Sequence, residues 1–215
     1  MGATGTRRLV VLDADSTLIN DEVIELLAAE AGSLASVADI TDRAMRGEID
    51  FSQSLRDRVA TLRGLTPAAI ARVQSRVTVT NGVSELIAAV HRGGGRVCVV
   101  SGGFHEVLDP VATKLGIDAW MANRLELAGD STLTGGVVGD IVDSHAKARA
   151  LEEWARDGDF PLEDTVAIGD GANDLEMMSV AGMSVAFCAK PIVRERASHT
   201  IDVRDMRLAI DLIGL

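Results

Sequence analysis

Two aspartates one residue apart, Asp13 and Asp15, follow the apolar run at residues 9–12 in the stretch RRLVVLDADSTLIN. Side chains two positions apart point to the same side of an extended chain, so both carboxylates can face one ligand. An ionised Asp13 could attack a phosphorus atom, and a neutral Asp15 could protonate the leaving oxygen and then deprotonate a water molecule. That division requires a raised pKa at Asp15 and a cation near Asp13. The alternative is a plain strand-to-helix turn, in which Asp and Ser serve as caps.

Polar and glycine residues also follow two other apolar runs. VCVV leads into Ser101, Gly102 and Gly103, and TVAI leads into GDGAND, which contains Asp170 and Asn173. Ligands bind beyond the carboxyl ends of the strands in an open parallel sheet, so these segments are expected to meet at one edge. Each motif alone is compatible with a tight turn, but together they predict a single site. GDGAND lacks the glycine spacing of a dinucleotide-binding loop and the Lys-Ser/Thr ending of a P-loop, which argues against a nucleotide-binding oxidoreductase.

The residue types at these strand ends suit a phosphate ester and a metal ion. Asp13 and Asp170 offer hard oxygen ligands of the kind that Mg²⁺ binds through one or two carboxylates, so we expect Mg²⁺ as the cofactor. The ion would offset the repulsion between an anionic nucleophile and an anionic phosphate. Phosphoryl transfer depends chiefly on positioning and charge stabilisation, which this set of residues can provide.

Ser101 and the amides of Gly102 and Gly103 could form a cradle for phosphate oxygens at the start of a helix predicted over residues 104–115. Lys147 would add a positive charge to the phosphate. Considered alone, SGG is typical of a tight turn and a single lysine is typical of a solvated surface. Their order along the chain, together with the aspartates, favours a phosphate site.

The elements that must position these residues alternate between strands and helices. Four short runs, LVVL, VCVV, TVAI and SVAFC, are separated by stretches whose apolar residues recur at helical spacing. Short apolar runs with helical crossovers predict an α/β fold around a buried parallel sheet. HTIDV and MRLAIDLIGL would add a last strand and a closing helix.

One long segment interrupts this alternation. Residues 20–75 have helical patterning almost throughout, with glycines where helices should end. We predict an α/β catalytic core at residues 1–18 and 78–215, and an inserted helical cap domain at residues 19–77. The stretch WMANRLELAGDSTLTGGVVG predicts a small hairpin or flap.

Charge and composition exclude several classes of partner. A net charge of -11 argues against binding of nucleic acid or of an anionic membrane, but is compatible with a small anionic substrate. Cys98 and Cys188 lie in apolar runs and are predicted to be buried free thiols. The chain has no apolar signal segment at its start and no run long enough for a spanning helix, so we expect a cytoplasmic enzyme, monomeric or homodimeric.

DADST, Ser101, Lys147 and GDGAND, in this order, resemble the four motifs of the haloacid dehalogenase-like hydrolases. Longer blocks resemble the branch of that family that hydrolyses phosphoserine, among them AMRGEIDFSQSLRDRV, VVSGGF, ANRLEL and AIGDGANDLEMM. The resemblance covers essentially the whole chain from Leu9 onward. It implies a Rossmann-like parallel sheet core with an inserted helical cap. It also implies hydrolysis of O-phospho-L-serine through an aspartyl-phosphate, the last step of serine biosynthesis.

The resemblance also implies a role for each matching position. Asp13 would be the nucleophile and Asp15 the general acid and base. The metal ligands would be the Asp13 carboxylate, the Asp15 main-chain carbonyl and Asp170, with Asp174 orienting metal-bound water. The phosphate-binding residues would be Ser101, Gly102 and Lys147. The substrate-binding residues would be Glu22 for the ammonium, Arg58 for the carboxylate, Met45 and Phe51 as apolar walls, and Asn173.

Other functions share parts of this pattern. A phosphatase for another small phosphomonoester, or a phosphotransferase to homoserine, would use the same chemistry. A receiver module, phosphorylated on aspartate as a signal, also binds Mg²⁺ beside an acidic strand end. Such a module has no use for the acid and base Asp15 or for a large helical insertion. Without the resemblance, Glu22 and Arg58 would be ordinary charges on helix surfaces.

Overall fold

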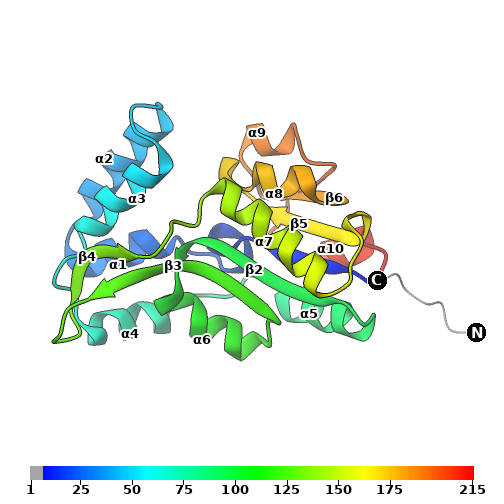
Figure 1. Ribbon diagram of the computed structural model, residues 1–215, viewed down its shortest axis with the longest axis horizontal. Helices are drawn as coiled ribbons and strands as arrows, with labels where there is room; N and C mark the ends of the chain where they lie inside the picture. Colours follow the sequence, from blue (N-terminus) through cyan, green and yellow to red (C-terminus); the bar gives the residue numbers. More distant parts are fainter. Residues whose placement is uncertain (1–6) are drawn as a thin grey trace, which may run out of the picture.

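The computed structural model describes residues 7–215 and contains one seven-stranded sheet with helices on both faces (Figure 1). The strand order is β4-β3-β2-β1-β5-β6-β7. All neighbouring strands are parallel except β3 and β4, which are antiparallel. The strands are β1 (Leu9–Leu12), β2 (Arg96–Phe104), β3 (Ala119–Leu127), β4 (Leu133–Val138), β5 (Thr165–Gly169), β6 (Met183–Phe187) and β7 (His199–Ile201).

Strand β1 is buried on both faces because it lies between β2 and β5 and helices cover each side. Val10 and Leu12 belong to one hydrophobic cluster and Leu9 and Val11 to the other, as the alternation of a strand requires. The first face is covered by α5 (Val83–Arg92), α6 (His105–Leu115) and α10 (Arg207–Leu212). The second is covered by α7 (Ser144–Asp157), α8 (Leu175–Val180) and α9 (Pro191–Arg194). The predicted α/β fold with a mostly parallel sheet is therefore confirmed.

Residues 20–75, in the connection from β1 to β2, are mostly helical, as predicted. This segment forms α1 (Val23–Ala31), α2 (Leu34–Met45), α3 (Phe51–Ala60) and α4 (Pro67–Arg76). Local signals set its boundaries: the Asp50 carboxylate accepts from Gln53 N at 2.8 Å, and Pro67 occupies the first turn of α4. A single bridge between Ile19 and Val79 joins the two ends of the segment. Helices α2 and α3 form a lobe that stands apart from the lobe of α8 and α9 (Figure 1).

The predicted hairpin exists, but it is part of the main sheet. Strand β3 pairs with β4 on one side and extends the parallel sheet beside β2 on the other. The hairpin also contacts the inserted segment, because Gly64 N donates to Leu133 O at 2.8 Å and Leu133 N donates to Leu65 O at 2.9 Å. It is therefore a sheet extension that braces the chain between α3 and α4, and not a detached flap.

Three local details differ from or add to the sequence expectations. Helix α6 begins at His105, one residue later than predicted, because β2 continues to Phe104. Both cysteines are free, but Cys188 is only half-buried. The short helix α9 had no predicted counterpart. No helix within residues 7–215 combines the length and the apolar character needed to cross a membrane.

Candidate active site

The main chain after β1 places the first two predicted residues at the edge of the sheet. Asp13 N donates to Ile168 O at 2.9 Å, so the residue is still anchored to β5, and its side chain is buried. Residues 14–18 then form one wide turn in which Leu18 N donates to Asp13 O at 3.2 Å. Asp15 is extended within this turn, and Val23 N at the start of α1 donates to its Oδ2 at 3.2 Å.

Lys147 lies beneath the site and not at its surface. Its ammonium is fully buried on α7 and donates to Asp13 Oδ1 at 2.6 Å and to Asp174 Oδ1 at 2.7 Å. A buried charge is tolerated only when it is paired and hydrogen-bonded, and two carboxylates satisfy that condition here. Burial alone would lower the pKa of Lys147, but the two carboxylates outweigh burial and raise it. The ammonium therefore stays charged.

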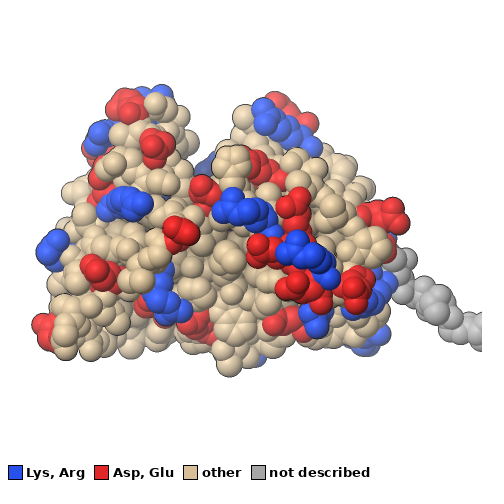
Figure 2. Space-filling model, in the orientation of Figure 1, with Lys and Arg blue, Asp and Glu red and all other residues tan. Residues whose placement is uncertain are grey.

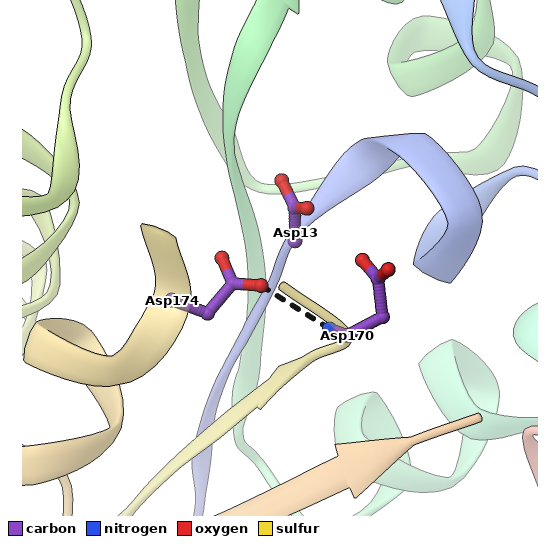
Figure 3. A group of neighbouring side chains, drawn as sticks. All are labelled: Asp13, Asp170 and Asp174. Atoms are coloured by element: carbon purple, nitrogen blue, oxygen red, sulfur yellow. Dashed lines mark hydrogen bonds between the residues drawn. The ribbon is translucent and has the colours of Figure 1, made fainter. Parts of the chain in front are cut away.

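The loop after β5 is built around the Asp174 carboxylate. Its Oδ2 accepts from Gly171 N at 3.0 Å and from Asp170 N at 3.1 Å, and the second bond is drawn in Figure 3. Gly169 allows this approach, because a Cβ on it would lie 2.3 Å from Asp174 Oδ2. The bonds turn the Asp170 side chain toward the space that Asp13 also faces (Figure 3).

Three carboxylates converge on this space and could hold a metal ion. Oxygen atoms of Asp13, Asp170 and Asp174 all lie within 4.8 Å of one another. One buried ammonium, that of Lys147, faces this cluster, so the negative charge is only partly offset. An all-oxygen, carboxylate-rich donor set suits a hard divalent cation. Both oxygens of Asp174 also accept hydrogen bonds, Oδ1 from Lys147 and Oδ2 from the amides of Asp170 and Gly171.

The crowding of these carboxylates raises their pKa values. Burial, and then repulsion by Asp174, raise the pKa of Asp13 to about 7 although Lys147 opposes the shift. Burial and Asp174 likewise raise the pKa of Asp170 to about 6. A bound cation would favour the ionised forms of both groups. The electrostatics therefore fit a divalent cation at this position.

Asp15 has the properties of a proton donor. Burial, followed by repulsion from Glu22 and Asp13, raises its pKa well above the usual range of a carboxyl group. Its Oδ1 is buried and has no hydrogen-bond partner within the described chain. A Cβ on Gly103 would lie 3.3 Å from this oxygen. A neutral carboxyl group with a free oxygen beside the end of β2 can donate a proton to a ligand held there.

The end of β2 carries the residues that the sequence predicts as a phosphate cradle. Ser101 is buried, and its Oγ accepts from Gly103 N at 2.8 Å. A Cβ on Gly103 would lie 3.0 Å from that Oγ, so a larger residue would crowd it. The Gly102 carbonyl is held by Asn123 Nδ2 at 2.9 Å. These glycines belong to the last residues of the strand, at the break in its register with β3, directly before α6 begins at His105.

A cavity of about 370 Å³ opens above these groups, a size suited to a small ligand. Figure 2 shows the hollow between the lobe of α2 and α3 and the lobe of α8 and α9. Two of the predicted site residues, Lys147 and Asp174, do not line it, and Lys147 is buried below Asp13. The predicted residues that line it are Asp13, Asp15, Glu22, Met45, Phe51, Arg58, Ser101, Gly102, Asp170 and Asn173.

The inserted helices contribute the wall opposite the carboxylates. Arg58 on α3 is half-buried, and burial lowers the pKa of its guanidinium, opposed by the charge of Glu22. Its Nε donates to Ser54 O at 3.2 Å, and it forms no ion pair among residues 7–215. Phe51 packs over Gly102, since a Cβ there would lie 3.2 Å from the Phe51 ring. Met45 is 72% exposed at the rim.

Two residues of the site were missed by the sequence prediction. Lys190 lines the cavity, and its main-chain N donates to Asp170 O at 3.0 Å. It follows β6, so the rule that ligands bind beyond strand ends could have found it. Asn123 on β3 is buried and bonds both Gly102 and Val142 N, the latter at 2.9 Å. No local pattern distinguishes it from an ordinary strand residue.

The geometry can now be compared with known proteins. Residues 10–179 match the haloacid dehalogenase-like hydrolase family. The chain belongs to this family. Members of the family use a metal ion, and in this hydrolase the cluster of Asp13, Asp170 and Asp174 could bind one.

Curated relatives of this hydrolase include phosphoserine phosphatases of several organisms. The chain is 48% identical over 205 residues to the phosphoserine phosphatase of Streptococcus thermophilus. The aligned region covers 95% of each protein. It is 51% identical over 209 residues to that of Streptomyces coelicolor, covering 97% of this chain but 51% of the relative. A solved phospho-aspartyl intermediate analogue of phosphoserine phosphatase superimposes with a TM-score of 0.90 at 43% identity, over 96% of this chain and 98% of the other. A substrate-bound phosphoserine phosphatase complex gives the same TM-score of 0.90 at 42% identity, with the same coverage.

Proposed function

We propose that this hydrolase converts O-phospho-L-serine and water to L-serine and inorganic phosphate, and that it is thus a phosphoric monoester hydrolase of serine biosynthesis. The observation that carries the proposal is the cavity, which is lined by Asp13, Ser101 and Gly102 for a phosphate and also by the acidic Glu22 and the basic Arg58. Phosphoserine bears a phosphate, an ammonium and a carboxylate, so its three charges match the three kinds of group. The phosphoserine phosphatases among the relatives support the same substrate.

In the proposed reaction, Asp13 attacks the phosphorus atom while Asp15 gives its proton to the ester oxygen. The ester P–O bond breaks, serine leaves with the proton, and an aspartyl-phosphate remains on Asp13. Asp15, now ionised, takes a proton from a water molecule that attacks the phosphorus atom. The Asp13–phosphorus bond then breaks, phosphate leaves, and Asp15 is again protonated. The raised pKa of Asp15 supports its starting form in this scheme.

Mg²⁺ is the proposed metal ion. The residues that would hold it are Asp13 and Asp170 together with the main-chain carbonyl of Asp15, and Asp174 would hold the loop that carries Asp170. When bound, the ion supplies charge neutralisation for the phosphate and for the nucleophile. Lys147 keeps one oxygen of Asp13 occupied through its 2.6 Å bond, which leaves the other oxygen free for attack.

The remaining substrate contacts are assigned to the cradle and to the helical insertion. Ser101 and Gly102 would contact the phosphate, Lys147 would act on it from beneath Asp13 through its charge, and Glu22 and Arg58 would bind the ammonium and the carboxylate. Arg58 supports this role because a half-buried guanidinium in the cavity wall has no ion-pair partner within residues 7–215. The other proposed substrate contacts are Met45, Phe51 and Asn173.

The domain division follows the same assignment. We propose residues 19–77 as a cap and residues 1–18 with 78–215 as the catalytic core. The cap would exclude bulk water from the cavity and select the substrate, while the core performs the chemistry. One chain contributes all the proposed contacts, so activity requires no second copy, and the protein would be active as a monomer or a homodimer.

A substrate panel with and without metal tests the proposal. Phosphate release is measured from L-phosphoserine, L-phosphothreonine, phosphocholine and phenyl phosphate, in the presence of EDTA or of Mg²⁺. We expect multiple turnovers with Mg²⁺, the highest kcat/KM for phosphoserine, and no turnover for Asp13→Asn. A higher kcat/KM for another ester would identify that ester, and not phosphoserine, as the preferred substrate. Full activity of the Asp13→Asn variant would overturn the mechanism.

A further inference from the structure

We propose that Ser16 is a positioning residue that fixes the Glu22 carboxylate for the ammonium group of the substrate. The inference rests on the proposed function, because it assigns to Ser16 a part in how phosphoserine is distinguished from other phosphate esters. Ser16 lies between the two aspartates of the first motif and the inserted helices, so it can link chemistry to substrate selection.

Ser16 has an unusual main-chain conformation that contacts from two sides hold in place. Its φ of 57° and ψ of 4° lie in the left-handed region, which a residue with a Cβ rarely adopts. Ser16 N donates to Asp21 O at 3.3 Å, and the Arg204 guanidinium donates to Ser16 O at 2.9 Å. Glycine would adopt this conformation more readily. The main-chain contacts offset part of this strain, and the serine side chain makes one further interaction.

That interaction is a hydrogen bond to Glu22. Ser16 Oγ donates to Glu22 Oε1 at 2.7 Å, and Glu22 precedes α1 at the wall of the cavity. Glu22 is exposed and forms no ion pair among residues 7–215, so this bond is the contact that restrains its carboxylate. A free glutamate side chain would lose considerable rotamer entropy on binding a ligand, and the bond to Ser16 removes part of that loss beforehand.

The same bond would also keep the carboxylate of Glu22 from pairing with the guanidinium of Arg58. Arg58 lines the cavity too, and Glu22 is the carboxylate whose charge acts most strongly on it. If Glu22 were free to turn, it could pair with Arg58, and both would then be unavailable for a zwitterionic ligand. Ser16 holds Glu22 in place, and the acid and the base remain separately available for an ammonium and a carboxylate.

Three phosphate esters separate this role from a general effect on the turn. L-phosphoserine carries both charges, O-phosphoethanolamine carries the ammonium without the carboxylate, and ethyl phosphate carries neither. For Ser16→Ala we expect kcat/KM to fall about tenfold on the two ammonium-bearing esters, through KM, with ethyl phosphate within about twofold. An equal fall on all three esters, or no change on any, would overturn the inference.

Further variants test whether Ser16 acts through Glu22 and not through strain. On the Glu22→Ala background, Ser16→Ala should cause no further loss, and an independent second loss would contradict the inference. Ser16→Gly also removes the hydroxyl but relieves the strain, so it should reproduce the KM effect without a lower Tm. Ser131→Ala is the matched control, because Ser131 also has a left-handed φ, of 65°, but lies exposed in the β3–β4 hairpin.

The failure of the proposed function gives a different result. If the wild-type enzyme does not prefer phosphoethanolamine to ethyl phosphate, then Glu22 does not bind the ammonium, and that substrate contact of the proposed function is overturned together with the role of Ser16. If the wild-type enzyme has that preference and Ser16→Ala retains it in full, only the role of Ser16 is overturned.

Discussion

Replacing Lys147 by methionine removes the buried positive charge that pairs with both Asp13 and Asp174. The ammonium is fully buried and lies 2.6 Å from Asp13 Oδ1 and 2.7 Å from Asp174 Oδ1. Methionine nearly matches lysine in length, so the substitution deletes the charge and both hydrogen bonds without opening a large cavity. The two buried carboxylates would then repel each other without a cation between them.

The size of the effect follows from the burial of the group. Removing one partner of a buried ion pair costs about 3–5 kcal/mol, because an uncompensated charge remains in the interior. Asp13 can reduce this loss by taking up a proton. Lys147 lowers the pKa of Asp13, which burial raises to about 7, so removing Lys147 raises that pKa further. In the variant, Asp13 therefore keeps its proton to a higher pH. The loss of stability caused by the substitution is then smaller at pH 5.5, where Asp13 is neutral, than at pH 8.

The free energy of unfolding is measured in urea at pH 5.5 and pH 8, first with EDTA and then with Mg²⁺. We expect Lys147→Met to lose about 3–5 kcal/mol at pH 8 without metal, and to recover part of this when Mg²⁺ supplies positive charge beside the same carboxylates. Lys190→Met is the control, because Lys190 lines the cavity without forming an ion pair in the described chain, and should change stability by less than about 0.5 kcal/mol. A loss below about 1 kcal/mol for Lys147→Met at pH 8, or a loss that grows as the pH falls, would refute the reasoning.

Three other predictions follow from the site. Arg58→Ala should lower kcat/KM for phosphoserine at least about tenfold more than for phenyl phosphate, and equal losses would contradict its carboxylate role. Gly103→Ala would place a Cβ 3.0 Å from Ser101 Oγ and should lower kcat at least about tenfold. Gly129→Ala, whose Cβ would have no neighbour within 4 Å, should leave kcat unchanged. Asp170→Asn should weaken Mg²⁺ binding at least about tenfold by calorimetry. Burial and Asp174 raise the pKa of Asp170 to about 6, so the native carboxylate costs stability as pH rises from about 4 to 6. Without metal at pH 8, the free energy of unfolding of Asp170→Asn should thus be about 1–3 kcal/mol higher than that of the wild-type protein. A variant less stable than the wild-type protein under these conditions would contradict this reasoning.

Much of the fold could be predicted because its signals are local. The run LVVL contains four consecutive apolar residues because a central parallel strand is covered on both faces, and β1 is indeed buried throughout. The inserted helices carried their own start signals, such as Asp50 and Thr66 with Pro67. The hairpin was recognised, but its pairing with β2 was not, because pairing between distant strands depends on contacts that no local pattern encodes.

The site divides in the same way. Asp13, Asp15, Ser101 and Asp170 could be expected to line one cavity because each lies at or just after the end of a strand, and parallel strands bring their carboxyl ends to one edge. The two hydrogen bonds from Lys147 to Asp13 and Asp174 could not be predicted from the sequence. They join residues 134 and 27 positions apart in the chain, so they exist only once α7 packs against the sheet.

The sequence by itself therefore determined which chemical groups this protein has and at which strand ends they lie, because residue type and periodicity are local properties. The tertiary structure decided their charge states and orientations. Burial raises the pKa of Asp15, a left-handed turn directs Ser16 at Glu22, and Arg58 lies in the cavity wall without an ion-pair partner in residues 7–215. Desolvation and pairing depend on what surrounds a group in space, and that environment is set only when distant segments pack together.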